Sequence, residues 1–232
     1  MKLLAIDTSS VACSVALQSG EQLEERHEEQ AREHTRLLTP MIRDVIESSG
    51  IELDELDAIV LGNGPGSFIG MRIAASVVQG LAHGAGLAIV PVSSLAAVAA
   101  EVFATRDAVE AIVTQDAHMN EVYLGVFRRG AGGILEERFP ERLQSQTRIE
   151  ELDEAGAETR VAAGFGWQRY PVLAEANQAI IGSFSAVEYP KARYLLALGA
   201  AALNRGGAVS PEHLVPAYLR SKVAEKPGQS DS

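Results

Sequence analysis

The sequence predicts an α/β protein built from two similar halves, and three observations lead to this prediction. Short apolar runs that fit buried strands alternate with longer stretches of helical periodicity. Each half opens on the same pattern, an apolar run that ends at an aspartate, a turn and an alternating strand. The chain has 232 residues, 47% of them apolar and 22% charged, so it can bury a core without metal or disulfide cross-links.

The first half opens with a predicted β-hairpin. An apolar run over Leu3–Ile6 ends at Asp7, and apolar and polar residues then alternate from Cys13 to Gln18, which is typical of a half-buried strand. Residues 22–30 are polar, so they fit either an exposed edge strand or the beginning of the following helix. The sequence leaves both alternatives open.

A helix is predicted between Leu37 and Gly50. Apolar residues recur at helical spacing from Leu37 onward, and Gly50 can cap the C-terminal end. Pro40 lies inside this period, and proline has no backbone N–H to donate within a helix. The helix therefore either kinks at Pro40 or begins with Thr39 as its N-cap and Pro40 at its first position.

The rest of the first half alternates strands and helices. A glycine-rich loop follows the next apolar strand, and Ser93 or Ser94 can cap the last helix of this half. The predicted elements are, in order, strand Ala58–Leu61, loop Gly62–Ser67, helix Gly70–Gly84, strand Leu87–Val92 and helix Leu95–Ala104.

The second half repeats the opening pattern of the first. The run Ala111–Asp116 again ends at an aspartate and is followed by an alternating strand. An offset of 109 residues superimposes the two openings, which indicates a weak repeat of a strand–Asp–turn–strand unit. The matched pairs are Asp7 with Asp116, Val15 with Leu124, and Leu17 with Val126.

The remainder of the chain carries fewer signals. A strand is predicted at Thr159–Ala163, a loop at Gly164–Gly166 and a helix over Ala192–Asn204. The last few residues belong to a tail rich in Pro, Gly, Ser and Asp, and they are predicted to be disordered.

A break at Arg106–Asp107 separates the two halves. We therefore predict an N-terminal lobe over residues 1–106 and a C-terminal lobe over 107–232, with the last helix and tail able to return to the first lobe. A duplicated α/β plan of this kind resembles actin, the sugar kinases and the heat-shock ATPase chaperones, in which each lobe is a ribonuclease-H-like unit. The resemblance implies a two-lobed actin-like fold, but a fold alone does not determine an activity.

Composition excludes several classes of protein. Twenty Lys and Arg against 31 Asp and Glu give a net charge of −11, which disfavours binding of tRNA or DNA by this chain alone. One cysteine, Cys13, cannot form an internal disulfide, and the N-terminus leads directly into a strand pattern rather than a signal peptide. Because no apolar run reaches the roughly 18–20 residues needed to cross a bilayer, we expect a cytoplasmic protein without a membrane span.

The acidic turns and the glycine-rich loop are candidates for an anion or nucleotide site. In the actin-like superfamily such turns and loops hold a phosphate and its cation between the lobes. The loop lacks the Lys-Ser/Thr of a P-loop and the spacing of a dinucleotide fingerprint. The alternatives are a tight strand-to-helix connection with positive φ and aspartates that merely cap their turns. A vestigial site would comprise Asp7, Thr8, Gly64, Gly66, Ser67 and Asp116.

No catalytic or metal constellation is evident in the sequence. The five histidines form no i, i+4 pair, so no metal site and no cofactor are predicted. Ser67 lies in GPGSF rather than in GxSxG, and Cys13 occupies an inward strand position typical of a buried, inert thiol.

Two helices offer more informative surfaces. Ser76, Gly80 and Gly84 recur at i, i+4 and i+8, which gives a ridge of small residues that another helix can approach closely. The preceding helix is apolar over a wide face. These faces either dock a partner or pack only on their own sheet.

Five segments distributed over nearly the whole chain resemble the bacterial TsaB (YeaZ) family. Ile69 stands where the family usually has Thr, and Ala74 where it often has Gly. The segments are Leu4–Ser9, Gly64–Ile73, Pro91–Leu95, Asp116–Tyr123 and Pro216–Arg220.

The resemblance implies a function in tRNA modification. TsaB proteins are needed to make threonylcarbamoyladenosine next to the anticodon of tRNAs that read codons beginning with A. They are similar to the catalytic subunit TsaD but lack its HxxxH metal motif, which agrees with the histidine spacing here. The chain is thus expected to be a pseudo-enzyme that activates TsaD, in a pathway with the ATPase TsaE and with TsaC, and to contact tRNA only indirectly.

The resemblance also implies a pairing surface on two N-terminal helices, which form a helical bundle with TsaD. Without TsaD the same surface is expected to form a homodimer, because a self-complementary apolar patch favours a twofold mate. The residues that match this surface are Leu38, Met41, Ile42, Val45, Ile73, Ser76, Val77, Gly80 and Leu81.

Two other functions remain as alternatives. The first is an independent phosphotransferase or ATPase that uses Asp7, Asp116 and the glycine-rich loop around magnesium and ATP. The second is a metallopeptidase, a label sometimes attached to relatives of this family. Titration with Mg-ATP and metal analysis of the purified protein distinguish these alternatives from a non-catalytic subunit.

Overall fold

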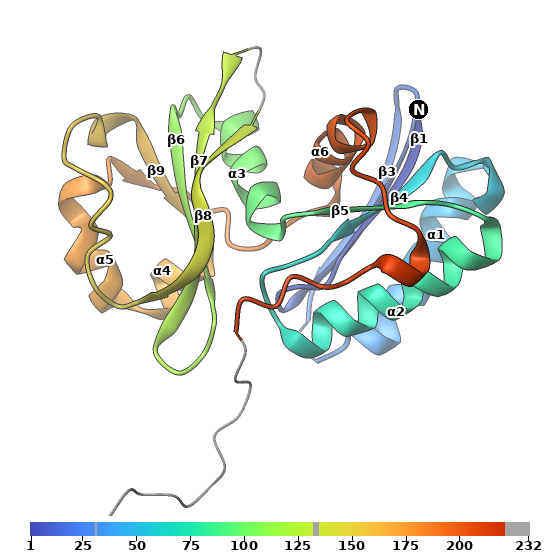
Figure 1. The fold of residues 1–232 in the computed structure, drawn as a ribbon, viewed down its shortest axis with the longest axis horizontal. Helices are drawn as coiled ribbons and strands as arrows, with labels where there is room; N and C mark the ends of the chain where they lie inside the picture. The colour runs from blue at the N-terminus through green and yellow to red at the C-terminus, as the bar shows by residue number, and fades with distance from the viewer. Residues whose placement is uncertain (31, 132–134, 221–232) are drawn as a thin grey trace, which may run out of the picture.

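The computed structural model describes residues 1–30, 32–131 and 135–220. Two five-stranded sheets with the same strand order form two lobes, as predicted (Figure 1). In each sheet three antiparallel strands are followed by two parallel ones. The first sheet has the order β3 (Gln22–Glu29), β2 (Ala12–Ser19), β1 (Lys2–Asp7), β4 (Ala58–Gly62) and β5 (Ile89–Val92). The second sheet, read in the matching direction, has the order β8 (Leu135–Ser145), β7 (Glu121–Arg129), β6 (Glu110–Asp116), β9 (Arg160–Ala163) and β10 (Ser183–Phe184).

Helices cover both faces of each sheet because strands alternate their side chains between two apolar layers. In the first sheet, Leu4 and Ile6 face α1 and α2, whereas Leu3 and Ala5 face α6. In the second sheet, α3 covers one face and α4 with α5 covers the other. The helices are α1 (His34–Ser49), α2 (Phe68–Ala85), α3 (Ser94–Thr105), α4 (Phe165–Arg169), α5 (Pro171–Asn177) and α6 (Ala192–Asn204).

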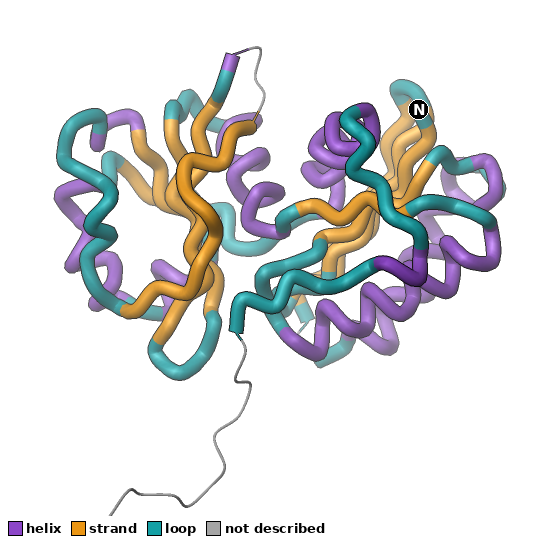
Figure 2. Tube along the Cα trace, in the orientation of Figure 1, coloured by secondary structure: helices purple, strands orange, loops and turns teal. Residues whose placement is uncertain are grey.

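Short 3₁₀ turns and loops connect these elements (Figure 2). The C-terminal helix α6 packs on the first sheet, and α3, which follows the first sheet in sequence, packs on the second. The two helices also contact each other between the lobes. The lobe boundary at residues 106/107 stays a prediction. The 3₁₀ turns are η1 (Leu53–Glu55), η3 (Ala157–Thr159), η4 (Gln178–Ile180) and η5 (Pro211–His213).

Most predicted elements are confirmed, and residues 22–29 of the polar segment 22–30 form the edge strand β3 rather than a helix. The alternative in which α1 begins at Thr39 is wrong, because α1 begins at His34 and continues through Pro40. Pro40 is exposed, as is Arg36, whose carbonyl loses its helical partner, so water can satisfy that oxygen.

Some elements of the second lobe are not predicted from the sequence. The predicted loop at 164–166 is wrong, since Phe165 begins α4. The strand β8 is half-buried and largely charged, and α5 spans less than two full turns, so neither gives a clear periodic signal. The predicted disorder of the last few residues concerns positions outside the described residues.

The internal repeat is confirmed in topology but shifted in one strand. Strands β2 and β7 correspond at an offset of 109 residues, because Val15 and Leu124 lie on equivalent faces of their sheets. Val15 faces the layer that contains α2, which follows β4, and Leu124 faces the layer of α4 and α5, which follow β9. Strands β1 and β6 correspond at an offset of 108, since the hairpin turns differ in length by one residue. The predicted match of the two aspartates is therefore wrong by one position. The pairings Ile6–Val15 and Thr114–Leu124 place Gln115, not Asp116, at the position of Asp7.

Among the described residues, no helix combines the length and the apolar character that crossing a bilayer requires.

Candidate functional site

An open surface of the first lobe lies along α2. This helix begins after Ser67, whose hydroxyl accepts a hydrogen bond from the Gly70 amide, and ends at Gly86 in the left-handed conformation. Nothing lies within 4 Å of a Cβ built on Gly80 or Gly84. The outer face of α2 is consequently a shallow ridge that a second helix can approach closely.

The predicted docking residues of α2 lie on or beside this ridge. Ser76 and Gly80 are exposed. Ile73, Val77 and Leu81 are half-buried, because they pack against the core below while part of each side chain still faces solvent. These five residues form what we call the α2 ridge.

The predicted docking residues of α1 are located differently. They are between 0 and 7% exposed and belong to the core between α1, α2 and the first sheet. Their apolar surface is thus already used within the chain, and their share in the pairing surface stays a prediction. The four residues are Leu38, Met41, Ile42 and Val45.

The β1–β2 turn and the glycine-rich loop pack directly on each other. The Ser67 amide donates to the Ser9 carbonyl at 2.6 Å, and the Thr8 hydroxyl donates to the Gly70 carbonyl at 2.7 Å. A Cβ on Gly66 would lie 2.1 Å from the Ser9 carbonyl oxygen, and one on Gly70 would lie 2.0 Å from that of Thr8. These glycines are therefore needed for close backbone packing.

The rest of the loop is also occupied by internal contacts. Gly64 has φ +88°, which confirms the predicted tight connection with positive φ. Its amide donates to the Ser94 hydroxyl at 3.1 Å, and this hydroxyl in turn donates to Asp7 at 2.6 Å. The Gly64 and Ser67 amides and the Thr8 hydroxyl, which belong to the predicted anion site, thus donate to groups of this chain.

Asp7 is buried at the centre of these contacts. One carboxylate oxygen accepts from the Ser9 amide and hydroxyl, and the other accepts from Ser94. Burial raises the pKa of Asp7 to about 6, although the hydrogen bonds from Ser94 and Ser9 act in the opposite direction. Asp7 is consequently a carboxyl that can take up a proton near neutral pH.

Asp116 has different surroundings. It accepts hydrogen bonds from the His118 amide and the Tyr170 hydroxyl, each at 2.8 Å, and it lies near Arg169. Asp7 and Asp116 share no hydrogen-bonding partner among the described residues, so each aspartate is held by its own set of contacts, and a joint site stays a prediction. No group of three or more metal-ligating side chains is found in residues 1–30, 32–131 and 135–220.

Cys13 is buried, as predicted for an inert thiol. Burial, together with the nearby Asp7 carboxylate, raises the pKa of this thiol to about 12. Because the thiolate is the reactive form, Cys13 is a poor nucleophile.

One titratable residue of the inter-lobe region is missed by the sequence reasoning. Glu141 of β8 accepts a hydrogen bond from the Ser93 hydroxyl at the beginning of α3. Burial raises the pKa of Glu141 to about 7, the Ser93 hydrogen bond lowers it, and the neighbouring Glu137 raises it. No sequence signal identifies Glu141, since β8 itself is not predicted.

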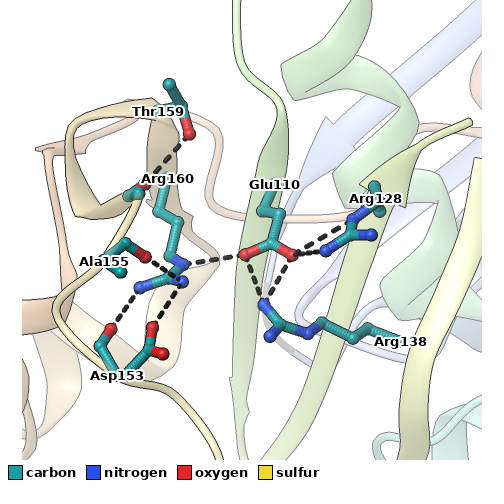
Figure 3. Close-up of polar contacts among 8 residues, drawn as sticks. Glu110, Arg128, Arg138, Asp153, Ala155, Thr159 and Arg160 are labelled. Atoms are coloured by element: carbon teal, nitrogen blue, oxygen red, sulfur yellow. Dashed lines mark hydrogen bonds and ion pairs between the residues drawn. The ribbon is translucent and has the colours of Figure 1, made fainter.

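A second missed cluster lies at the opposite end of the second sheet (Figure 3). Glu110 at the beginning of β6 is 4% exposed and forms ion pairs with Arg128, Arg138 and Arg160. Burial by itself would raise the pKa of Glu110, but the guanidinium groups, led by Arg160, outweigh it and lower the pKa. Each carboxylate oxygen has an arginine partner, so this cluster joins strands β6, β7, β8 and β9.

Comparisons with known proteins agree with this architecture. A family model described as "TsaD: tRNA N6-adenosine threonylcarbamoyltransferase" matches residues 23–227. The chain is 35% identical to the tRNA threonylcarbamoyladenosine biosynthesis protein TsaB of Escherichia coli, with 97% of each chain covered. It is also 35% identical to TsaB of Haemophilus influenzae, over 97% of this chain and 96% of that one.

Solved structures from Pseudomonas aeruginosa have the same fold. One, described as an uncharacterized protein with similarity to peptidase YEAZ, is 36% identical with a TM-score of 0.87. Another, described as YeaZ, is 35% identical with a TM-score of 0.86. Both comparisons cover 94% of this chain and 99% of the other. These structural likenesses confirm the predicted two-lobed actin-like fold. Together with the 35% identity to the two TsaB proteins, they show that the chain belongs to the TsaB (YeaZ) family.

Proposed function

We propose that this chain is a non-catalytic subunit that binds and activates a TsaD-type transferase in tRNA threonylcarbamoyladenosine biosynthesis. The names of the relatives from Escherichia coli and Haemophilus influenzae support the pathway. The match to the TsaD model supports a partner with a related fold. Related subunits can pair through equivalent helices, as the two copies of a homodimer do.

The α2 ridge is the observation that carries this proposal. Open space lies above Gly80 of the ridge and above Gly84, one turn further along α2. Ile73, Val77 and Leu81 supply half-buried apolar surface beside that space. A helix of the partner that lies along this ridge gains close backbone packing and buries the apolar edges. In the absence of the partner, a second copy of this chain occupies the ridge.

The packing of the glycine-rich loop on the β1–β2 turn supports a non-catalytic role. The Ser67 and Gly64 amides and the Thr8 hydroxyl donate to groups of this chain. A phosphate would have to break these contacts before it could bind to the same groups. The transfer reaction therefore takes place on the TsaD-type partner, with TsaE and TsaC acting in the same pathway.

The charge distribution agrees with an indirect role toward tRNA. A net charge of −11 repels a phosphate backbone, so other subunits supply most of the contacts to tRNA. The lone protein is expected to bind tRNA weakly at moderate salt.

A reconstituted transfer assay tests the proposal. TsaD, TsaE and TsaC are combined with tRNA and the threonylcarbamoyl donor system, with and without this chain. We expect co-purification of this chain with TsaD and loss of transfer when the chain is omitted. Transfer that persists without the chain, or turnover of substrate by the chain alone, would contradict the proposal.

Gly80→Arg tests the α2 ridge itself. The arginine places a long charged side chain where the partner helix approaches, and we expect affinity for TsaD to fall by at least about a hundredfold. Ala176→Arg on α5 is the matched control, because it adds the same side chain to an exposed helical position of the second lobe. Equal affinities of the two variants, measured by titration calorimetry with each variant folded, would exclude the ridge as the interface.

Two measurements on the isolated protein address the alternatives. Calorimetric titration with Mg-ATP should show no tight binding and no turnover, whereas an independent ATPase would show both. Metal analysis should give no stoichiometric zinc or iron, whereas a metallopeptidase would retain one of them.

A further inference from the structure

The last described segment, residues 214–220, runs along the first lobe and ends on the second (Figures 1 and 2). Its first contact is the glycine-rich loop. The Asn63 side-chain amide donates to the Val215 carbonyl at 3.0 Å, and the Ala217 amide donates to the Asn63 carbonyl at 3.1 Å. Asn63 thus binds this segment on both sides of Pro216.

The segment next contacts the first turn of α2. The rings of Tyr218 and Phe68 are 5.1 Å apart, and the Arg72 guanidinium donates to the Tyr218 hydroxyl at 3.2 Å. Arg72 also lies over the Phe68 ring, with its guanidinium carbon 3.8 Å from the ring centre. The Tyr218 ring is therefore fixed to the first lobe by stacking and by a hydrogen bond.

Arg220 then reaches the turn between β6 and β7 in the second lobe. One guanidinium nitrogen donates to the Glu121 carboxylate at 2.5 Å and to the Ala117 carbonyl at 3.0 Å. The second terminal nitrogen, Nη1, lies 3.3 Å from the Met119 sulfur. The Arg220 side chain is 15% exposed, so this charge-assisted contact is largely shielded from water.

The turn that Arg220 holds has an unusual backbone. His118, Met119 and Asn120 have φ values of +59°, +52° and +60°, and left-handed backbone is unfavourable for L-residues other than glycine. On one side of the turn, the Asp116 carboxylate accepts a hydrogen bond from the His118 amide. On the other side, the Arg220 guanidinium donates to the Ala117 carbonyl. Such a backbone persists only where its surroundings determine it.

We propose that residues 214–220 form an inter-lobe latch, in which Arg220 fixes the β6–β7 turn to the glycine-rich loop and the first turn of α2. The lobes can then separate at this side only if the segment leaves the glycine-rich loop and α2, or if Arg220 leaves the β6–β7 turn. On another side of the contact between the lobes, the Lys191 ammonium and the buried Glu101 carboxylate are 2.5 Å apart and join α6 to α3. That pair is a second polar contact between the lobes, apart from the latch.

Inter-lobe distance measurements test the latch. Spin labels are placed at Glu47→Cys on α1 and Glu175→Cys on α5, both exposed positions, one in each lobe. The native Cys13 is buried and its raised pKa keeps it from being labelled. In this background we compare the parent chain, Arg220→Met and Tyr218→Ala, with Arg205→Met as the matched control because Arg205 is an exposed arginine after α6.

We expect a narrow distance distribution for the parent and the control, and a broader, longer one for both latch variants. Hydrogen exchange should accelerate about tenfold or more at the Ala217 amide, which donates to the Asn63 carbonyl, and at the Ala117 amide together in each variant. Loss of a charge-assisted or aromatic contact corresponds to at least that factor. Unchanged exchange in the central strands β1 and β6 shows that each variant is folded, and Tyr218→Ala keeps the test valid if Arg220→Met does not fold.

Two outcomes would overturn the latch. In the first, both variants keep the narrow distribution of the parent. In the second, Arg220→Met loosens the β6–β7 turn while the Ala217 amide stays protected, so that Arg220 only shapes a local turn.

Discussion

The two lobes have the same strand order but are held together by different interactions. At the offset of 108 residues that relates β1 to β6, Lys2 corresponds to Glu110. Lys2 forms a partly exposed ion pair with Glu55, whereas Glu110 is buried among three arginines. At the other end of these strands, the first lobe packs glycines against the β1–β2 turn, and the second lobe holds a strained turn with Asp116 and Arg220.

This difference shows that a repeated topology does not require repeated contacts. The sheet order depends on apolar patterning, which both lobes satisfy. The ends of the strands are free to differ, and in this molecule they do. The first lobe carries the α2 ridge and depends on close backbone packing beneath it, while the second lobe depends on buried charge.

The largest effect is expected from Glu110→Gln. Removing the carboxylate charge leaves Arg160, which is 4% exposed, without its main ionic partner, and breaking a buried pair in this way typically costs about 3–5 kcal/mol. The free energy of unfolding, measured in urea, should fall by about that amount. Lys2→Met at the corresponding position of the first lobe should give no measurable change, and equal losses at both positions would refute the contrast between the lobes.

Gly70→Ala should give the next largest effect. The added methyl would lie 2.0 Å from the Thr8 carbonyl oxygen, so the β1–β2 turn must move, and we expect a loss of about 3 kcal/mol. Gly80→Ala on the same helix meets open space and should instead stabilise the protein by about 0.5–1 kcal/mol. Urea unfolding of both variants provides the measurement, and a neutral Gly70→Ala would show that the turn is not rigidly packed.

Asp7→Asn should change the pH dependence of stability. Since burial raises the pKa of Asp7 from 3.8 to about 6, the folded state favours the protonated form. The parent chain therefore loses stability as pH rises from about 4 through about 6, and the uncharged variant does not. The difference in unfolding free energy should shift in favour of the variant by about 2–3 kcal/mol between pH 4 and pH 7.

Asp7→Glu provides a control for this prediction, because it keeps the charge. It should retain a fall in stability with rising pH, whereas Asp7→Asn should not. Parallel pH profiles for the parent and Asp7→Asn would mean that Asp7 is already ionised throughout this range.

The sequence predicts the features of this fold that depend on periodicity. The helix over Ala192–Asn204 is predicted with its observed bounds, and the two hairpins are found from their alternation. The sequence does not distinguish the buried residues Leu38 and Val45 of α1 from the exposed positions of α2, because helical spacing shows an apolar face but not what covers it.

The sequence misses the features that depend on contacts between distant segments. Glu110 and Arg160 are 50 residues apart, and nothing near either residue indicates their pairing. The match of Asp7 with Asp116 fails for a related reason. A one-residue difference in turn length moves a side chain to the other face of a strand, and residue identity alone does not reveal such a shift.

The smallest effect is expected from Glu141→Gln, which tests whether the junction between the lobes titrates. The pKa of Glu141 is raised from 4.5 to about 7, so its contribution to stability is present below about pH 4.5 and is lost as pH rises through about 7. Because Glu141 is only half-buried, solvent screening reduces the effect, and we expect the variant to gain about 1 kcal/mol relative to the parent between pH 5 and pH 8. Glu137→Gln on the same strand separates the two causes: because the Glu137 charge raises the pKa of Glu141, its removal should lower that pKa slightly and shift the loss of stability to lower pH. A parent chain whose stability is flat from pH 5 to pH 8 would show that Glu141 reaches solvent freely and that the contact with Ser93 does not close this junction.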